Sequence, residues 1–513
     1  MKKIMPVILL FTLITFLACN GGSAGSTVAD KAVTDDTLIV IMSGEAVTLD
    51  PQASNDSATS RVTKQIYNTL VTQNENMEIV PQLAESWEIT DNGTLLSLKL
   101  REGVKFHNGE TFTAQDVKFT LERALTSPHV SHIISVIAPN GITIIDDYSL
   151  EIRMTDSFAP ILSHLAHTAI SILNEKAVTE AGDSYGQNPV GTGPYQFVQW
   201  VLGDNITLVR NDDYFDENAK IKNLMLRVIT ENSARAIALE TGDAHIAYDL
   251  APNDIARMEA SDALKVIRSA NFSSAYIGFN ASKAPFNDIK VRQAINLALD
   301  MDSIIEAVYF GAGSPAKGPI GQKVWGYNTA LPGYDYDIQR AKELMIEAGY
   351  QNGFTTTIWT NDNQQRIDIA EIAQAQLAEI GITVEIEILE WAAYLERTAL
   401  GDHEMFILGW VTVTGDPDYG LYATFHSNSF GSAGNRTFYA NARVDELLDR
   451  ARVSGDPTVR EEAYKEVQEI IFDEAPWIFT WEGEDLNGAQ SYIEGFVNNP
   501  SGHHRLDTVY FNK

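Results

Sequence analysis

The sequence predicts an α/β protein with more than one domain, on the strength of two observations. First, stretches that alternate apolar and polar residues, as strands do, are interspersed with stretches whose apolar residues recur at helical spacing. Second, the chain has 513 residues, too many for a single hydrophobic core, and 44% of them are apolar, as in globular proteins. Strands alternating with helices favour mixed sheets, and the length favours about two to four domains.

The chain begins with the pattern of a bacterial export signal. Lys2 and Lys3 precede an apolar run from Ile4 to Leu17, which is too short and wrongly flanked for a mature transmembrane helix. Residues 1–19 are therefore predicted to be a signal peptide. No other segment is apolar over the roughly 18 residues that a membrane span needs.

The position of Cys19 predicts a lipid anchor. It is the only cysteine, which excludes an intramolecular disulfide. It follows Leu17 and Ala18 as in a bacterial lipobox, where the thiol is acylated after cleavage, although Phe16 occupies the position usually held by leucine. A chance cysteine at the end of the signal is the alternative. Residues 20–36 are small and polar without periodicity, as expected of a flexible tether.

The charge of the chain limits its partners. The formal net charge is −32 at pH 7. A polyanion of this size repels phosphate backbones, and the sequence has no basic stripe, so nucleic acid is not an expected partner. An acidic surface can steer cationic ligands, but solubility is the simpler explanation for it.

The clearest local pattern lies between residues 81 and 124. Alternation with polar residues predicts a half-buried hairpin from Trp87, Ile89, Leu96, Leu98 and Leu100. Its turn is expected at Asp91–Gly93, because Asn and Gly tolerate positive φ. Thr113 and Asp116 then form a capping-box pattern, and apolar residues follow it at helical spacing. A helix is therefore expected directly after the hairpin.

The remaining elements alternate along the chain. Strands are expected over 37–42, 142–154, 197–228, 383–388 and 406–413. Helices are expected over 60–70, from Asp288, from Asp337 to Gly349, over 366–380 and from Asp456-Pro457. In three of these helices an aspartate supplies the N-cap, and in two a glycine supplies the stop.

Four stretches of the sequence resemble the peptide/nickel-type solute-binding proteins of ABC importers, the extracytoplasmic solute-binding protein family 5. They are LAESWEI with LREGVKFHNGETFTAQDVKFTLERAL (83–125), NPVGTGPYQFVQW (188–200), YIGFNASKAPFNDIKVRQAINLALD (276–300) and APWIFTW (475–481). The likeness covers nearly all of the mature chain in the family's order. It is therefore more specific than any single short motif.

The resemblance implies a periplasmic-binding-protein-like fold, in which two large lobes with mixed sheets are joined by a two-segment hinge and carry a smaller inserted domain. The implied division is 37–79, 188–277 and 480–513 for lobe I, 80–187 for the inserted domain packed on lobe I, and 278–479 for lobe II. The chain is expected to cross between the lobes at Tyr276–Asn280 and at Trp477–Trp481. Two crossing segments suit a hinge.

The resemblance also implies where a ligand binds. In this family the segment that follows a Gly-Trp pair offers its backbone to an extended peptide, which adds to the sheet as a further strand. The expected ligand-binding residues are Gly409, Trp410, Val411, Thr412, Thr414 and Asp416 on this segment, Trp391 and Arg436 beside it, and Asn55, Asp56 and Ser57 on the opposing wall. For the two tryptophans, a place in the core is the alternative.

The charged anchors of the family's ligands are altered in this sequence. Dipeptide and oligopeptide binders carry an Asp three residues after that Trp, which pairs with the α-ammonium group of the ligand, whereas this sequence has Val413. A buried ammonium group without a partner would cost several kcal/mol. Either Asp416 or Asp418 takes over this role, or the ligand is not an ordinary α-peptide.

The anchor for the carboxylate of the ligand is altered as well. The arginine that holds it in dipeptide binders corresponds to Thr360, and Arg366 and Arg436 are the nearest alternatives.

Metal and enzymatic sites are not expected. His129 with His132 and His164 with His167 could each share a helix face, but neither pair has a Cys or acidic partner at a recognisable spacing. The sequence has no G-x-S-x-G, P-loop or H-E-x-x-H motif. The glycines of Gly191–Pro194 favour a tight turn over a phosphate cradle.

The expected function is the capture of a short peptide or peptide-like solute between two lobes, without catalytic residues, metal or cofactor. The expected partners are the solute, the subunits of an ABC permease and a membrane that holds the lipid anchor, in the periplasm or on the outer face of the cell membrane. A monomer is expected. The alternatives are an oligosaccharide-binding member of the same family, a secreted hydrolase, and an adhesin or chemoreceptor partner on the same scaffold.

Overall fold

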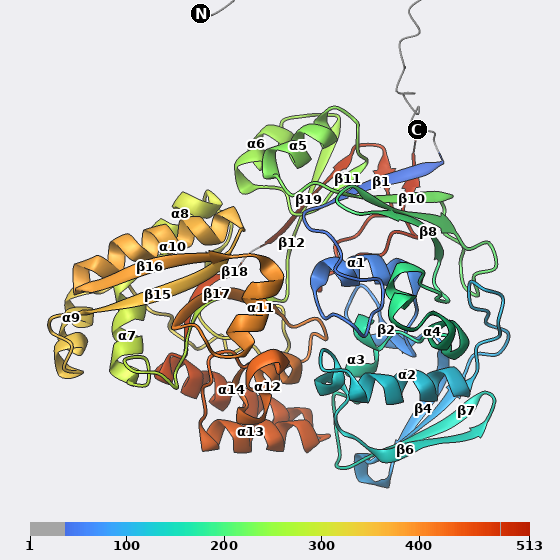
Figure 1. The fold of residues 1–513 in the computed structure, drawn as a ribbon, viewed down its shortest axis with the longest axis horizontal. Coiled ribbons are helices and arrows are strands. Elements are labelled where there is room, and N and C mark those ends of the chain that lie inside the picture. The colour runs from blue at the N-terminus through green and yellow to red at the C-terminus, as the bar shows by residue number, and fades with distance from the viewer. Residues whose placement is uncertain (1–35, 483, 513) are drawn as a thin grey trace, which may run out of the picture. The chain divides into compact units, whose positions relative to one another are not determined.

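The structure is a computed structural model that describes residues 36–482 and 484–512, and it shows an α/β protein (Figure 1). The predicted signal peptide, Cys19 and nearly all of the predicted tether lie outside the described residues. Within the described part of the chain, no helix is both long and apolar enough to cross a membrane.

Two large mixed sheets and one smaller antiparallel sheet organise the described chain. In spatial order, the first sheet contains β12 (Leu264–Ala270), β19 (Glu484–Gln490), β11 (Ile246–Ala247), β1 (Thr37–Met42), β10 (Asn223–Val228), β9 (Asn205–Arg210) and β8 (Tyr195–Val201). The second contains β14 (Ser314–Pro315), β18 (Trp477–Glu482), β13 (Ser273–Phe279), β17 (Met405–Val411), β15 (Phe354–Asn361) and β16 (Ile382–Leu389). The third contains β4 (Ala84–Thr90), β5 (Leu95–Leu100), β7 (Ser149–Met154) and β6 (Ile137–Asp146).

Two short strand pairs and the helices complete the fold. The pairs are β2 (Val71–Gln73) with β3 (Ile79–Pro81) and β20 (Ile493–Glu494) with β21 (Tyr510–Phe511). The helices are α1 (Ser57–Ile66), α2 (Ala114–Thr126), α3 (Ile161–Leu165), α4 (Glu175–Ala181), α5 (Asn232–Glu240), α6 (Pro252–Glu259), α7 (Ile289–Ala298), α8 (Met301–Tyr309), α9 (Ile338–Glu347), α10 (Gln364–Leu377), α11 (Trp391–Ala399), α12 (Pro417–Phe425), α13 (Ala442–Val453) and α14 (Pro457–Glu474).

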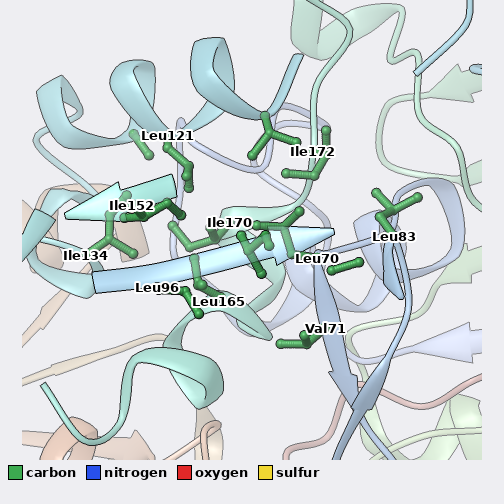
Figure 2. Packing of buried hydrophobic residues seen from close by; sticks show 14 of the residues in the cluster. Leu70, Val71, Leu83, Leu96, Leu121, Ile134, Ile152, Leu165, Ile170 and Ile172 are labelled. Carbon is green, nitrogen blue, oxygen red and sulfur yellow. The ribbon is translucent and has the colours of Figure 1, made fainter. Parts of the chain in front are cut away.

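The third sheet confirms the strongest local prediction. Strands β4 and β5 pair antiparallel around the turn at Asp91–Gly93, where Asn92 has a φ of 54°. Leu96 on β5 pairs with Ile152 on β7, and Figure 2 shows both side chains in a buried cluster with Leu121 of α2. Ile89 differs from the expectation, since its side chain is 40% exposed at the end of the hairpin.

The predicted caps are also present. Asp116 and Thr113 form a capping box at the start of α2. The side chains of Asp288, Asp337 and Asp456 accept backbone N–H groups at the starts of α7, α9 and α14. Each cap satisfies donors that the first helical turn leaves without partners, which is why these helices begin where they do.

The first helix lies earlier in the chain than expected. The sequence predicts a helix over residues 60–70, whereas α1 runs from Ser57 to Ile66. Asp56 accepts the N–H of Thr59 and so starts the helix, and Tyr67 is already extended. Tyr67 and Leu70, which continue the apolar spacing of the helix, lie in the core without prolonging the helix.

The points at which the chain changes sheet also differ from the expectation. Tyr276 and its neighbours lie inside β13 of the second sheet, because β13 pairs with β17 over its whole length and with β18 from Ala275 to Gly278. The first change therefore falls between β12 and β13, at Asn271–Phe272. Residues 477–481 likewise belong to β18, and the second change falls between β18 and β19.

The glycines before β8 serve a close approach of two backbones. The N–H of Gly193 donates to the carbonyl of Ile66 at 2.8 Å. A Cβ atom would lie 2.1 Å from this carbonyl oxygen if built on Gly191 and 2.6 Å from it if built on Gly193. The glycines are thus required because a side chain at either position would clash with the backbone of Ile66.

Candidate ligand-binding site

Strand β17 carries Gly409 and Trp410 and is called the Gly-Trp strand. One of its two edges is paired over only part of its length in the described chain. β17 pairs with β13 from Met405 to Val411, but with β15 only at Met405 and Phe406. Within the described chain, the β15 side of Leu408–Val411 therefore has no strand pairing. Such an edge can accept an extended chain through main-chain hydrogen bonds.

The loop that follows β17 is held by bonds within the chain. The N–H of Thr412 donates to Phe272 O at 3.1 Å, and Gly415 N–H closes a turn onto Thr412 O at 2.8 Å. The Gln73 amide donates to Thr414 O at 2.6 Å. These backbone groups of Thr412 and Thr414 therefore already have partners within the chain, and ligand contacts of the two threonines stay predictions. Gly409, Trp410 and Val411 remain predicted ligand contacts.

The two aspartates after this loop are neutralised by arginines. Asp416 caps α12 and pairs with Arg460, whose Nη2 lies 2.7 Å from Oδ1. Asp418 is 1% exposed and receives Nε and Nη2 of Arg452 at 3.1 and 2.9 Å. Both carboxylates thus already have a cationic partner, and the role of Asp416 or Asp418 as the replacement for the missing anchor stays a prediction.

Tyr419 joins the opposing wall to the Gly-Trp strand. Asn55 donates to its hydroxyl at 3.0 Å, and His167 Nε2 lies 3.2 Å from the same oxygen. The indole N–H of Trp410 donates to the Tyr419 carbonyl at 3.2 Å. The structure thus brings Asn55 and Trp410 to one residue that the sequence did not single out, because Tyr419 lies in a helix without any recognisable motif.

The neighbours of Asn55 have structural roles. Asp56 caps α1 and accepts the hydroxyl of Ser54 at 2.6 Å. Ser57 is exposed as the first residue of that helix. As ligand contacts, both stay predictions.

The two tryptophans are half-buried and have different neighbours. Trp391 begins α11 and packs on Tyr394, with the guanidinium of Arg366 5.6 Å from its ring centre. Trp410 packs on Tyr419 with ring centres 5.4 Å apart. Each therefore contributes one face to packing, and a role in the pocket stays a prediction for both.

Arg436 is a buried guanidinium without a carboxylate. It is 9% exposed, and its Nε donates to Thr398 Oγ1 at 3.2 Å. Within the described part of the chain, no Asp or Glu lies within 4.0 Å of it. Burial lowers the pKa of Arg436, and nearby Tyr276 and Tyr394 oppose this shift. A cation that is desolvated in this way is suited to an anionic ligand group.

The position that corresponds to the family's carboxylate anchor is also buried. Thr360 is fully buried on β15, and its hydroxyl has no hydrogen-bond partner among the described residues. Arg366 donates to Asn361 Oδ1 at 2.9 Å and faces Trp391. Of the two alternatives, Arg436 is the more buried, and its Nη groups have no partner within the described residues.

The histidines are mostly buried and uncharged. In the described residues, no group of three or more His, Cys, Asp or Glu side chains is arranged to hold a metal ion. Burial lowers the pKa of His107 and His132 to about 4. It lowers the pKa of His403, His503 and His504 to about 3. Burial also lowers the pKa of His164 and His167.

These shifts predict a loss of stability in acid. Unfolded histidines titrate near pH 6.5, so below that pH the unfolded chain binds more protons than the folded chain. The free energy of unfolding should therefore fall between about pH 6.5 and 4, by on the order of 1.4 kcal/mol per pH unit for each histidine that stays neutral when folded. Burial raises the pKa of four carboxyl groups, and their titration changes the stability in the opposite direction. These groups belong to Asp116, Asp254, Glu482 and Asp485.

Urea denaturation at pH 7.5, 6.0, 5.0 and 4.5 checks this prediction. The histidines outnumber the four carboxyls, so the midpoint should fall at each step below pH 6.5. A midpoint that stays constant or rises towards pH 4.5 would contradict it.

A strand edge that is unpaired over Leu408–Val411 in the described chain, together with the buried cation of Arg436, suits the binding of a small solute. Comparison with known proteins agrees with this class. Residues 78–432 match the model of the bacterial extracellular solute-binding proteins, family 5 (middle). The chain belongs to this family and is an extracytoplasmic solute-binding protein.

Individual relatives cover nearly the whole chain. A glutathione-binding protein of Pectobacterium atrosepticum is 31% identical over 488 residues, which are 93% of this chain and 95% of the relative. Heme-binding protein A of Haemophilus influenzae is 33% identical over 473 residues, 86% of each chain. The solved structure of the periplasmic binding protein DppA of Helicobacter pylori with the peptide STSA has a TM-score of 0.88 and 33% identity, covering 93% of this chain and 98% of that one.

Proposed function

We propose that this protein is the substrate-binding component of an ABC importer and captures a short peptide or peptide-like solute. The observation that carries the proposal is the β15-facing edge of Leu408–Val411, which includes Trp410 and has no strand partner in the part of the chain that the structure describes. A peptide added at this edge would be held by main-chain bonds regardless of its side chains. The relatives named for glutathione and for a bound peptide support this class of ligand.

We further propose that the first and third sheets belong to one half of a hinged trap and the second sheet to the other. The chain passes between the first and second sheets twice, at Asn271–Phe272 and between β18 and β19. Lobe I would then comprise 37–79, 188–272 and 484–512, with 80–187 inserted, and lobe II 273–482. Closing around the solute would exclude water and strengthen each polar contact.

The location of the protein follows from the same proposal. Residues 1–19 would be removed as a signal peptide, and Cys19 would carry the lipid. Residues 20–36 would let the binding part reach the permease. The protein would act as a monomer without metal, cofactor or catalytic residues.

Calorimetry with a pool of di- to pentapeptides tests the function. One-site, saturable binding is expected, and mass spectrometry should recover the peptides unchanged. A hydrolase would consume them, and an oligosaccharide-binding protein would give saturable heat with sugars and none with peptides. Either result would overturn the proposal.

A further inference from the structure

A small cavity lies beside Val413, the residue that replaces the family's ammonium-pairing aspartate. Its volume is about 20 Å³, enough for roughly one water-sized group. Its lining includes Lys64 in the last turn of α1, His167 and His503. His167 caps the short 3-10 helix Thr168–Ile170, and His503 lies near the C-terminus. The cavity is therefore suited to one end group of a ligand and not to a whole solute.

Lys64 is a partly buried cation without an acidic partner. Its ammonium group lies 3.3 Å from Thr72 Oγ1, and no carboxylate of the described chain lies within 4.0 Å. Burial, with a contribution from Arg505, lowers the pKa of Lys64 to about 8, and Asp507 opposes this shift. At neutral pH the group thus stays mostly charged, although it lacks full solvation.

The other cations near Lys64 are neutralised. Arg61 pairs with Asp249, with Nη1 2.5 Å from Oδ2, and Arg505 pairs with Asp507. The positive charge of each of these arginines is therefore compensated by its own aspartate. Lys64 is left as one uncompensated positive charge, in a chain whose net charge is −32.

His503 gives a second, independent indication. It is 6% exposed, and neither ring nitrogen has a hydrogen-bond partner among the described residues. Burial together with Lys64 and Arg61 lowers the pKa of His503 to about 3, so the ring is neutral and keeps one N–H to donate. His167, by contrast, uses both nitrogens, with Ala169 N–H and the Tyr419 hydroxyl as partners.

We propose that this cavity receives an anionic group of the ligand, a carboxylate held by the ammonium of Lys64 and the ring N–H of His503. The inference rests on the proposed function and specifies its substrate class. The solute would carry a carboxylate at the end next to Val413, where an ordinary peptide would place its α-ammonium group. With Arg436 available for a second anion, the structure favours peptides with an acidic group at each end and no ammonium group, such as N-dicarboxyacylated peptides.

Three peptides that differ only at the N-terminus test this inference by calorimetry: Ala-Ala-Ala, its N-acetyl form and its N-succinyl form. We expect the succinyl peptide to bind at least about tenfold more tightly than the free-ammonium peptide, with the acetyl peptide between them. Lys64→Met should remove this preference and leave the affinity for the acetyl peptide unchanged. Lys118→Met, a half-exposed lysine of α2 next to Glu122, is the matched control and should change nothing.

The outcomes separate the two proposals. If the ammonium peptide binds as tightly as the succinyl peptide or more tightly, the inference is wrong while peptide binding stands. A succinyl preference that survives Lys64→Met would show that the cavity is not the anionic site. If none of the three peptides binds, the inference is wrong, and the pool of di- to pentapeptides then decides separately whether the proposed function stands. His503→Gln, which keeps one N–H, should retain more of the preference than His503→Leu.

Discussion

Replacing Arg436 by methionine should weaken the binding of peptides that have a free C-terminal carboxylate by at least roughly 30-fold. Removing one partner from a buried charge pair costs about 2–5 kcal/mol. Arg436 is buried, and among the described residues Thr398 is its one side-chain hydrogen-bond partner, so a ligand carboxylate would be its first anionic neighbour. Calorimetry of the variant with the pooled peptides measures the loss.

The same substitution should not lower the stability of the protein. Methionine fills a similar volume and removes an uncompensated buried cation, which is neutral or favourable for folding. Arg436→Lys should keep part of the affinity, because it restores the charge without the planar fork. Arg443→Met is the control, since Arg443 is an exposed arginine of α13 that pairs with Glu446. Unchanged affinity in Arg436→Met would exclude the residue as the anchor.

Replacing Arg452 by methionine should reduce the free energy of unfolding by about 3–5 kcal/mol, because it strands the buried charge of Asp418. Asp418 is 1% exposed, and its other close titratable neighbour is His164, whose Nε2 is 3.6 Å away and whose pKa is lowered by burial. The Arg452 side chain also covers the rings of Phe158 and Tyr422. For a chain of this length, the loss corresponds to a fall in Tm of roughly 3–5 °C.

The reverse substitution should be milder. Asp418→Asn leaves Arg452 without its partner, but this arginine is 16% exposed and retains the aromatic contacts. Thermal unfolding of the two variants, with Arg443→Met as the surface control, tests the asymmetry. Equal losses for all three would show that the buried pair does not stabilise the fold.

Elements fixed by local signals could be predicted from the sequence. The hairpin of β4 and β5 follows from alternation and from a turn at Asp91–Gly93, and α7, α9 and α14 follow from their aspartate caps. The exact position of α1 and the points where the chain changes sheet could not be predicted. An apolar run looks the same in a helix or in the core, and strand pairing depends on partners far along the chain.

The site was predictable only where the resemblance supplied it. It placed Trp410 and Asn55, and the structure brings both to Tyr419. The pairing of Asp416 and Asp418 with arginines could not be predicted, because these partners lie 44 and 34 residues away along the chain. Lys64 and His503 were missed because they meet only through folding. No local pattern distinguishes one lysine at a helix end or one histidine near the terminus.

The distance between the two proposed lobes, with and without peptide, tests the trap most directly. Spin labels at Glu88 on β4 and Glu379 after α10, both exposed, would report it in a chain that starts after Cys19. When a peptide shown by calorimetry to bind is added, the distance distribution should shift to a single, shorter distance. An identical distribution for the free and the peptide-bound protein would contradict closure around the solute.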